Sequence, residues 1–441
     1  MKKFLALLCT AAMLVSIAGC NKSAETTTTA SADTSDLTVT EADTTTLADP
    51  ATATDAPVTE ETIEIPEDSE YVIENGITER MKALSTYVKG NQARLAKVFK
   101  KAMNGEKLTV AYLGGSITQG SSAGDNLCYS KLTTDWLKET FPDAEIEYVR
   151  AGIGATGSYI GVHRANRDVL YSDPDLIFID FSVNDGNAAR DVDSYDSLLR
   201  KLWFHTSNPA IVTIAMTQEN GTSFQKYHSE ICKAYQIPMI SYREAILDVI
   251  ENGHIVWKDI SDDNIHPNIT GHAVLTEIIT AYLQDVIDNI DSIDTETESD
   301  LSTPYTENKY ENADILTPET TTPADATGWE TDLEKFGNFG GYWTVRSKDG
   351  TFEGVNPLKF EVEAKNIGVF YGKLITTGGK FDVVVDGEVV KTIDSNFEGG
   401  WGSYVEAEDV ISFDEVGKHT VEIVPHTGEK ALITISAIAI S

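Results

Sequence analysis

The chain has 441 residues, and its 34 basic and 70 acidic side chains give a formal net charge of −36. Such a charge repels nucleic acids and anionic lipid headgroups, and it favours neutral or cationic substrates. Only four cysteines occur in this length of chain, so a fold built on a disulfide framework is excluded.

The first 20 residues have the features of an export signal. Two lysines are followed by an apolar run that is too short for a lasting membrane span. The run ends in IAGC at Cys20, which resembles the lipobox of bacterial lipoproteins, in which the cysteine is lipidated and the signal is cut off before it. We therefore expect a signal peptide over residues 1–20 and a lipid anchor on Cys20 that holds the protein at the bacterial cell surface. An ordinary signal peptide with a chance cysteine is the alternative.

Two cysteines remain beyond this segment, Cys128 and Cys232. They are able to pair with each other or to stay buried as free thiols, and the sequence leaves both options open. Neither has a spacing to histidine that is typical of a metal site, and we expect neither a metal ion nor a cofactor.

Two segments have too few apolar residues to offset the entropy lost on ordering. Residues 21–65 are rich in Thr, Ala and Asp, which predicts a disordered tether. Residues 291–327 are acidic and rich in Thr, which predicts a linker. The chain is therefore expected to contain two folded domains, over residues 66–290 and 328–441.

Helical and strand patterns alternate in the first of these domains. Helical spacing occurs at 79–103, 127–140, 161–171 and 195–205, and β-rich runs occur at 108–113, 146–149, 176–183 and 210–216. This alternation predicts a parallel sheet with helices on both faces.

The second domain has short alternating runs and no convincing helix. Asp386-Gly387 joins two of these runs and is a strong signal for a hairpin. We expect an all-β sandwich of the jelly-roll type. Four of its aromatic side chains either stack on sugar rings or pack in the core, and core packing is the more common use of such residues: Phe339, Tyr342, Trp343 and Trp401.

A serine follows the first β-rich run of the first domain. Ser116 lies in GGSITQG, just past the run 108–113. Because α/β folds bind their ligands at the carboxyl ends of parallel strands, this serine is a candidate nucleophile. A Gly/Ser turn is common and has no catalytic meaning by itself, so the assignment depends on the residues that accompany it.

Two further segments come directly after predicted strands. The glycine-rich segment GIGATGS includes Gly154 and Ala155, and its backbone N–H groups are able to bind a negatively charged oxygen. Asn184 follows the run 176–183, which places its side-chain amide at the same edge of the sheet. Asparagine is also a common turn former, and this is the alternative for Asn184.

Asp263 and His266 stand three residues apart in DNIHP, near the end of the first domain. At this spacing the carboxylate is able to orient the imidazole, and the imidazole is able to take a proton from Ser116. A surface histidine behind an N-cap aspartate is the alternative. Trp257 precedes this segment and either walls a substrate pocket or packs in the core.

Other polar residues of the domain fit no catalytic motif. Asp185, Arg164 and Arg167 are expected to form local salt bridges. Five histidines are expected to be surface or packing residues: His163, His205, His228, His254 and His272.

The four segments, in this order and each beside a strand end, resemble the SGNH or GDSL family of hydrolases over roughly residues 108–285. The resemblance implies a flavodoxin-like, three-layer α/β/α domain. It makes Ser116 the nucleophile, with Asp263 and His266 as the pair that activates it. Here the first block is GGSIT instead of GDSL, as in several esterase branches that the chain is similar to.

The resemblance also implies an oxyanion hole made of three donors. These are the backbone N–H of Ser116, a backbone N–H of the second block and the side chain of Asn184. The register of GIGATGS puts the second-block donor at Gly154, which we name first, or at Ala155. Both residues have the N–H group, and the choice stays open at this point.

Members of the family act on carbohydrate, lipid and other esters, so the fold and the triad do not determine the substrate. A surface anchor, an acidic enzyme and a separate β-domain together resemble carbohydrate esterases that remove acetyl groups from plant polysaccharides and carry a sugar-binding module. We therefore expect a serine esterase that removes small acyl groups from carbohydrate. The alternatives are a lipase or lysophospholipase, a glycan O-acyltransferase, and a non-catalytic glycan-binding lipoprotein.

Overall fold

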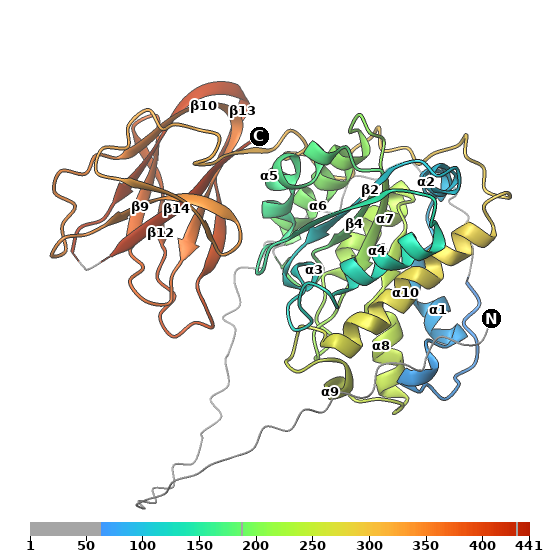
Figure 1. Ribbon diagram of the computed structural model, residues 1–441. Helices are drawn as coiled ribbons and strands as arrows, with labels where there is room; N and C mark the ends of the chain where they lie inside the picture. Colours follow the sequence, from blue (N-terminus) through green and yellow to red (C-terminus); the bar gives the residue numbers. More distant parts are fainter. Residues whose placement is uncertain (1–62, 187, 429–430) are drawn as a thin grey trace, which may run out of the picture. The chain divides into compact units, whose positions relative to one another are not determined.

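The computed structural model describes residues 63–186, 188–428 and 431–441 (Figure 1). The predicted signal peptide, Cys20 and most of the predicted tether lie outside the described residues. Within the described ranges, no helix combines the length and the apolar character needed to cross a membrane.

The first domain is built on a six-stranded sheet with the order β1-β6-β5-β4-β2-β3. Strands β2 to β6 are parallel, and β1 pairs with β6 in the antiparallel sense. In chain order the five parallel strands are arranged 2-1-3-4-5, which is the flavodoxin-like order that the family resemblance implies. The strands are β1 (Thr86–Val88), β2 (Leu108–Gly114), β3 (Ile146–Gly152), β4 (Leu176–Asp180), β5 (Ala210–Ala215) and β6 (Met239–Ser241).

Helices cover both faces of this sheet, as predicted. Successive residues of β2 point to opposite faces, so Val110 and Tyr112 join one apolar cluster and Ala111 and Leu113 join the other. The first cluster includes α2 (Ala93–Met103), α4 (Tyr129–Thr140), α8 (Tyr242–Glu251) and α10 (Ile269–Asp288), and the second includes α5 (Ser158–Asp168), α6 (Ala188–Trp203) and α7 (Gln225–Tyr235). Helices α4 and α10 lie side by side on their face (Figure 1).

The remaining helices of this domain are short. They are η1 (Ile73–Asn75), α1 (Glu79–Ser85), α3 (Ser116–Gln119), η2 (Leu170–Ser172) and α9 (Trp257–Ile260).

The predicted helical run 79–103 is interrupted in the structure. It divides into α1, the edge strand β1 and α2. Gly90 lies between β1 and α2 with φ +66°, and a Cβ at this position would lie 2.5 Å from Pro238 N. The chain therefore needs a glycine in the left-handed region here, and a continuous helix is impossible.

The second domain is all-β and antiparallel, as predicted. Its hydrogen-bonded strand order is β12-β11-β13-β10-β14-β9-β8, with β7 also paired to β14. Asp386 and Gly387, at φ +52° and +86°, form the predicted hairpin turn between β11 and β12. The strands are β7 (Asp314–Leu316), β8 (Glu330–Phe336), β9 (Gly340–Arg346), β10 (Leu358–Lys373), β11 (Lys380–Val385), β12 (Glu388–Asp394), β13 (Tyr404–Pro425) and β14 (Leu432–Ile440).

The segment predicted as a linker, residues 291–327, contributes to the packed structure. Its strand β7 pairs with β14, and Tyr310, Ala313 and Ile315 are buried. The acidic, Thr-rich composition hides these few apolar residues. They are sufficient because β14 supplies hydrogen-bonding partners for the backbone.

Candidate active site

The first three blocks of the motif meet at one edge of the sheet. Gly114 at the end of β2 pairs in register with Gly152 of β3 and with Asp180 of β4. The segments that follow these three strands therefore leave the sheet at the same level. This register brings the segments that carry Ser116, GIGATGS and Asn184 together at the carboxyl edge.

Close approach of the segments explains the glycines. A Cβ on Gly115 would lie 2.2 Å from Asn184 Oδ1, and a Cβ on Gly152 would lie 2.1 Å from the backbone nitrogen of Gln119. Real Cβ atoms do not tolerate such contacts, so any side chain at these positions would push the blocks apart. Gly115, the second residue of GGSIT, is therefore a glycine because a side chain there would collide with the side chain of Asn184.

The predicted triad is assembled in the structure. His266 Nε2 lies 2.9 Å from Ser116 Oγ, and His266 Nδ1 lies 2.7 Å from Asp263 Oδ2. Ser116 is the first residue of α3 and is 9 % exposed. The three side chains form one hydrogen-bonded chain from carboxylate to imidazole to hydroxyl, the arrangement that activates a serine.

The turn between α9 and α10 holds the pair in place. Asp263 Oδ1 accepts hydrogen bonds from the backbone N–H groups of Ile265 and His266, both at 2.7 Å. Ser261 Oγ donates to the carbonyl oxygens of Asp263 and His266. Trp257 is buried and donates from Nε1 to the Asp263 carbonyl at 2.7 Å, so its side chain supports the turn that carries Asp263 and His266.

Hydrogen bonding keeps the Asp263 carboxyl group ionised. Partial burial raises its pKa, but hydrogen bonds from the His266 backbone N–H, the His266 ring and the Ile265 N–H outweigh this effect and hold the pKa below its usual value. An ionised Asp263 accepts a hydrogen bond from the N–H at His266 Nδ1, and this tautomer leaves the lone pair on Nε2 facing Ser116 Oγ.

The structure favours Ala155 over Gly154 as the second-block donor. Gly154 is the first candidate donor named from the sequence. Its N–H donates to Gln119 Oε1 at 2.7 Å, so it is already occupied. Ala155 adopts φ +58°. In the described part of the chain, no hydrogen bond uses the backbone N–H of Ser116, the N–H of Ala155 or the side-chain amide of Asn184 as a donor.

Arg164 forms the predicted local salt bridge and also bonds the backbone of two strands. It pairs with Asp168 at 2.9 Å, and its guanidinium also donates to the carbonyl oxygens of Gly114 and Ala151, both at 2.8 Å. This fully buried side chain therefore ties together the ends of β2 and β3. Arg167 also pairs with Asp168, as predicted.

The histidines outside the triad divide into buried and more exposed groups. His163, His228 and His272 are buried. Burial lowers the pKa of His163 to about 3 and that of His272 to about 4, so both are neutral near pH 7. His254 pairs with Asp68, and His205 bonds Ser207.

The two cysteines are buried free thiols. This settles the pairing of Cys128 and Cys232 that the sequence leaves open. No group of three or more His, Cys, Asp or Glu side chains within the described ranges is arranged to hold a metal ion.

Asp180 at the end of β4 predicts a pH-dependent contribution to stability. It is 2 % exposed, its Oδ1 has no hydrogen-bond partner among the described residues, and burial raises its pKa to about 7. Because this folded-state pKa lies above the unfolded value of 3.8, the native state is favoured while the group is protonated. The contribution is complete below about pH 4 and is lost as the pH rises through about 7, at roughly 1.4 kcal/mol per pH unit.

Asp180→Asn should therefore gain stability relative to the wild type as the pH rises from about 5 to about 8. Urea unfolding of both proteins at the two pH values measures this difference. A difference in unfolding free energy that does not change with pH would show that Asp180 does not titrate in this range.

Comparison with known proteins agrees with this geometry. The model of the GDSL-like lipase/acylhydrolase family matches residues 112–274, a range that contains the nucleophile, both donor segments and the Asp-His turn. A crystal structure described as a two-domain esterase (CEX) active on acetylated mannans is 31% identical to this chain. The match covers 84% of this chain and 98% of that chain, with a TM-score of 0.73. The chain belongs to the GDSL-like lipase/acylhydrolase family.

A second structure extends the comparison. The same kind of two-domain esterase, co-crystallised with mannopentaose, is also 31% identical, with 84% of this chain and 97% of that chain covered and a TM-score of 0.72. Because each match covers 84% of this chain, it extends over both the α/β domain and the β-domain. A search of curated proteins gave no match. Family membership and these neighbours make this GDSL-like chain an esterase.

Proposed function

We propose that this esterase removes acetyl groups from an acetylated polysaccharide of the mannan type through an acyl-enzyme on Ser116. The observation that carries the proposal is the continuous hydrogen-bonded chain from Asp263 through His266 to Ser116. The substrate class is supported by the similarity over both domains to an esterase active on acetylated mannans.

The chemistry follows from the placement of these groups. Ser116 Oγ attacks the acetyl carbonyl carbon while His266 Nε2 takes the hydroxyl proton. The carbonyl oxygen becomes negative and accepts hydrogen bonds from the Ser116 N–H, the Ala155 N–H and the Asn184 amide. When the intermediate collapses, the bond to the sugar oxygen breaks and His266 gives its proton to that oxygen, leaving acetyl-Ser116 and a free sugar hydroxyl.

The second half of the reaction uses the same groups. A water molecule gives a proton to His266 Nε2 and attacks the acetyl carbonyl, and the oxyanion forms at the same place. Collapse breaks the bond to Ser116 Oγ, which regains the proton from His266. Acetic acid leaves and ionises to acetate in solution, and the enzyme returns to its starting state. A glycan O-acyltransferase would replace this water with an acceptor hydroxyl.

Acetate release from acetylated mannan, acetylated xylan, acetylated pectin and aryl esters of increasing acyl length tests the substrate class. Acetylated mannan and short acyl groups should react fastest. A preference for long acyl chains, with no release from any polysaccharide, would favour the lipase alternative. Transfer of acetyl to added oligosaccharide in preference to water would favour the acyltransferase.

We propose that the β-domain binds a sugar unit in one of its pockets. This pocket has a volume of about 610 Å³ and lies along β8, β9 and the loop that follows β9. Of the four aromatic candidates, Tyr342 lines it, Phe339 and Trp343 are buried in the core, and Trp401 lies elsewhere at 72 % exposure.

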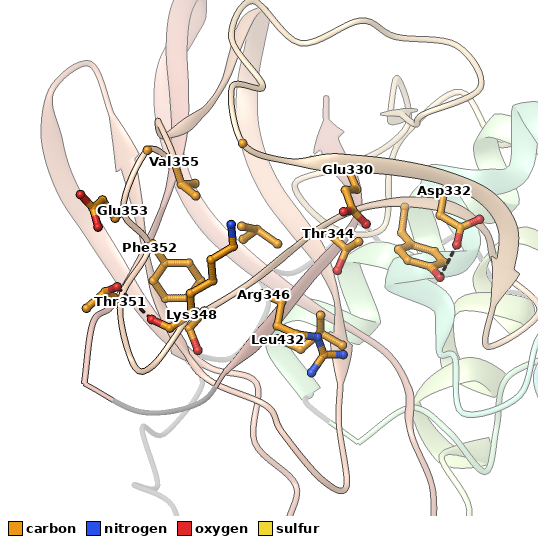
Figure 2. Close-up of a pocket in the computed structure, with 15 residues that line it drawn as sticks. Glu330, Asp332, Thr344, Arg346, Lys348, Thr351, Phe352, Glu353, Val355 and Leu432 are labelled. Atoms are coloured by element: carbon orange, nitrogen blue, oxygen red, sulfur yellow. Dashed lines mark hydrogen bonds between the residues drawn. The ribbon is translucent and has the colours of Figure 1, made fainter.

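The lining of this pocket suits a ligand rich in hydroxyl groups. Figure 2 shows Arg346 and Lys348 between Phe352 on one side and Glu330 with Thr344 on the other. Carboxylate, guanidinium, ammonium and hydroxyl groups are able to bond sugar hydroxyls, and aromatic rings are able to stack on sugar faces. The Tyr342 hydroxyl donates to Asp332 at 2.8 Å, which fixes the position of its ring.

The polysaccharide assay tests this pocket with an added variant. Tyr342→Ala should raise KM for acetylated mannan and leave KM for aryl acetate unchanged, because only the polymer is long enough to use both sites. Tyr171→Ala, which removes an exposed tyrosine of the first domain, is the matched control. Equal KM values for the polymer in all three proteins would mean that the pocket takes no part.

For the location of the enzyme, we propose attachment to the bacterial membrane by lipid on Cys20. The support is the IAGC sequence that follows the apolar signal. Cys20→Ser should move the protein out of the membrane fraction of expressing cells. An unchanged membrane fraction would contradict the anchor.

A further inference from the structure

The loop between β3 and α5 carries the Ala155 N–H in a strained conformation. Ala155 has φ +58°, and a non-glycine residue in the left-handed region costs roughly 1–2 kcal/mol. The loop is also glycine-rich, with Gly154 and Gly157 on either side of Ala155-Thr156. Such a loop keeps one conformation only if its surroundings hold it.

Gln119 holds the first end of this loop. Its Oε1 accepts the Gly154 N–H at 2.7 Å, and it is the last residue of α3, the helix that Ser116 begins. A Cβ on Gly154 would lie 3.2 Å from this oxygen, so the amide side chain packs directly on the loop. The hydrogen bond ties the residue before Ala155 to the segment of the nucleophile.

Asp185 holds the second end of the loop. Its Oδ1 accepts the backbone N–H of Ser158 at 2.7 Å, and a Cβ on Gly157 would lie 2.4 Å from the same oxygen. Asp185 directly follows Asn184 in the chain. One side chain therefore links the segment of the Asn184 donor to the far end of the Ala155 loop.

A buried histidine completes this second attachment. His228 Nε2 lies 2.8 Å from Asp185 Oδ2, and the two side chains are 1 % and 0 % exposed. The His228 ring stacks on Tyr195, with ring centroids 3.6 Å apart and an interplanar angle of 6°. Burial raises the pKa of Asp185, and the hydrogen bond from His228 opposes this rise.

Burying such a pair is costly and gives little net stability in most proteins. The pair touches neither Ser116 nor His266 in any described contact. Asp185 Oδ2 bonds the His228 ring, and Asp185 Oδ1 accepts the N–H of Ser158.

We propose that Gln119 and the Asp185–His228 pair are positioning residues that hold the Ala155 N–H and the Asn184 amide at the site where the oxyanion forms. Within the loop, Thr156 Oγ1 donates to the Ile153 carbonyl at 2.7 Å and stiffens the span between the two attachments. This inference rests on the proposed function, because it assigns these residues to the oxyanion hole of that reaction.

Two variants test the proposal. Gln119→Met keeps the length of the side chain and removes the acceptor, and His228→Phe keeps an aromatic ring against Tyr195 and removes the donor. Each should lower kcat on aryl acetate by about 10- to 100-fold with little change in KM, since loss of a whole oxyanion donor costs roughly 10²–10³. His228→Gln, which again offers a donor to Asp185, should recover much of the loss.

A second readout separates positioning from a general structural effect. Methylboronic acid forms a tetrahedral, negatively charged adduct with a serine hydroxyl, and its affinity should fall by the same factor as kcat/KM in both variants. Gln92→Met, at the N-cap of α2, is the matched control and should behave as the wild type. If His228→Phe does not fold, Gln119→Met alone still decides the question.

Unchanged kcat and unchanged boronate affinity in Gln119→Met would overturn the proposal. The same holds for a loss in His228→Phe that His228→Gln does not recover. These results are distinct from a failure of the proposed function, which would appear as a wild-type protein without esterase activity or as an active Ser116→Ala variant.

Discussion

Ser116→Ala should reduce kcat for aryl acetate by roughly 10⁴-fold or more, to the level that the oxyanion donors and substrate binding support alone. The reason is that the variant cannot form the acyl-enzyme, while the rest of the site stays in place. The Ser116 hydroxyl has His266 as its side-chain partner, so its loss should leave the fold intact. Initial rates and circular dichroism of the purified variant measure both effects.

Ser122→Ala is the control for this substitution. Ser122 is an exposed serine in the loop that follows α3, and its variant should retain wild-type rates. Wild-type turnover by Ser116→Ala would remove Ser116 from the nucleophile position. A loss of activity together with a loss of fold would require a milder change at the same residue, such as Ser116→Cys, which keeps a nucleophile.

Asp263→Asn should lower kcat by roughly 10⁴-fold, as expected when the carboxylate that orients a catalytic histidine becomes an amide. The new Oδ1 is able to keep the hydrogen bonds from the N–H groups of Ile265 and His266. Its Nδ2 would then donate to His266 Nδ1, which moves the histidine proton to Nε2. In this tautomer Nε2 no longer accepts the proton of Ser116.

Asp262→Asn provides the matched control, because it removes the same charge from the exposed neighbouring residue. It should retain wild-type kcat. If kcat falls by a similar factor in both variants, the loss of negative charge near the turn explains the effect, and the tautomer of His266 does not. A wild-type rate in Asp263→Asn would show that His266 is oriented without the carboxylate.

The residues of the triad were accessible to sequence reasoning because each follows a recognisable strand or stands in a short turn. Ser116 follows a wholly buried strand, and Asp263 and His266 are close enough in the chain to meet within one turn. The flavodoxin-like order then brings these positions to one edge of the sheet. Local patterns and a family motif were sufficient for this much of the site.

Contacts between distant segments were not accessible in the same way. Nothing in the sequence shows that Gln119 occupies the Gly154 N–H or that His228 reaches Asp185, because both contacts depend on the packing of separate loops and helices. The φ of +58° at Ala155 was also hidden, since the pattern favoured glycine for an unusual backbone. Gly154 is the less suitable donor because its N–H already donates to Gln119 Oε1.

Two features of the fold were missed for related physical reasons. The edge strand β1 lies inside a region with helical spacing, and it forms because β6 offers backbone partners to Thr86 and Val88. Strand β7 lies in an acidic segment that composition assigns to a linker, and β14 draws it into the sheet. In both cases tertiary hydrogen bonding outweighs the local preference of the sequence.

The most direct test of the account is mass spectrometry of the enzyme quenched with acid during turnover of acetylated mannan oligosaccharide. We expect a fraction of the protein to carry one acetyl group, located on the peptide that contains Ser116, and we expect Ser116→Ala to carry none. Acetate release by the wild type with no acetylated protein at any time, or with acetyl on another residue, would contradict an acyl-enzyme on Ser116.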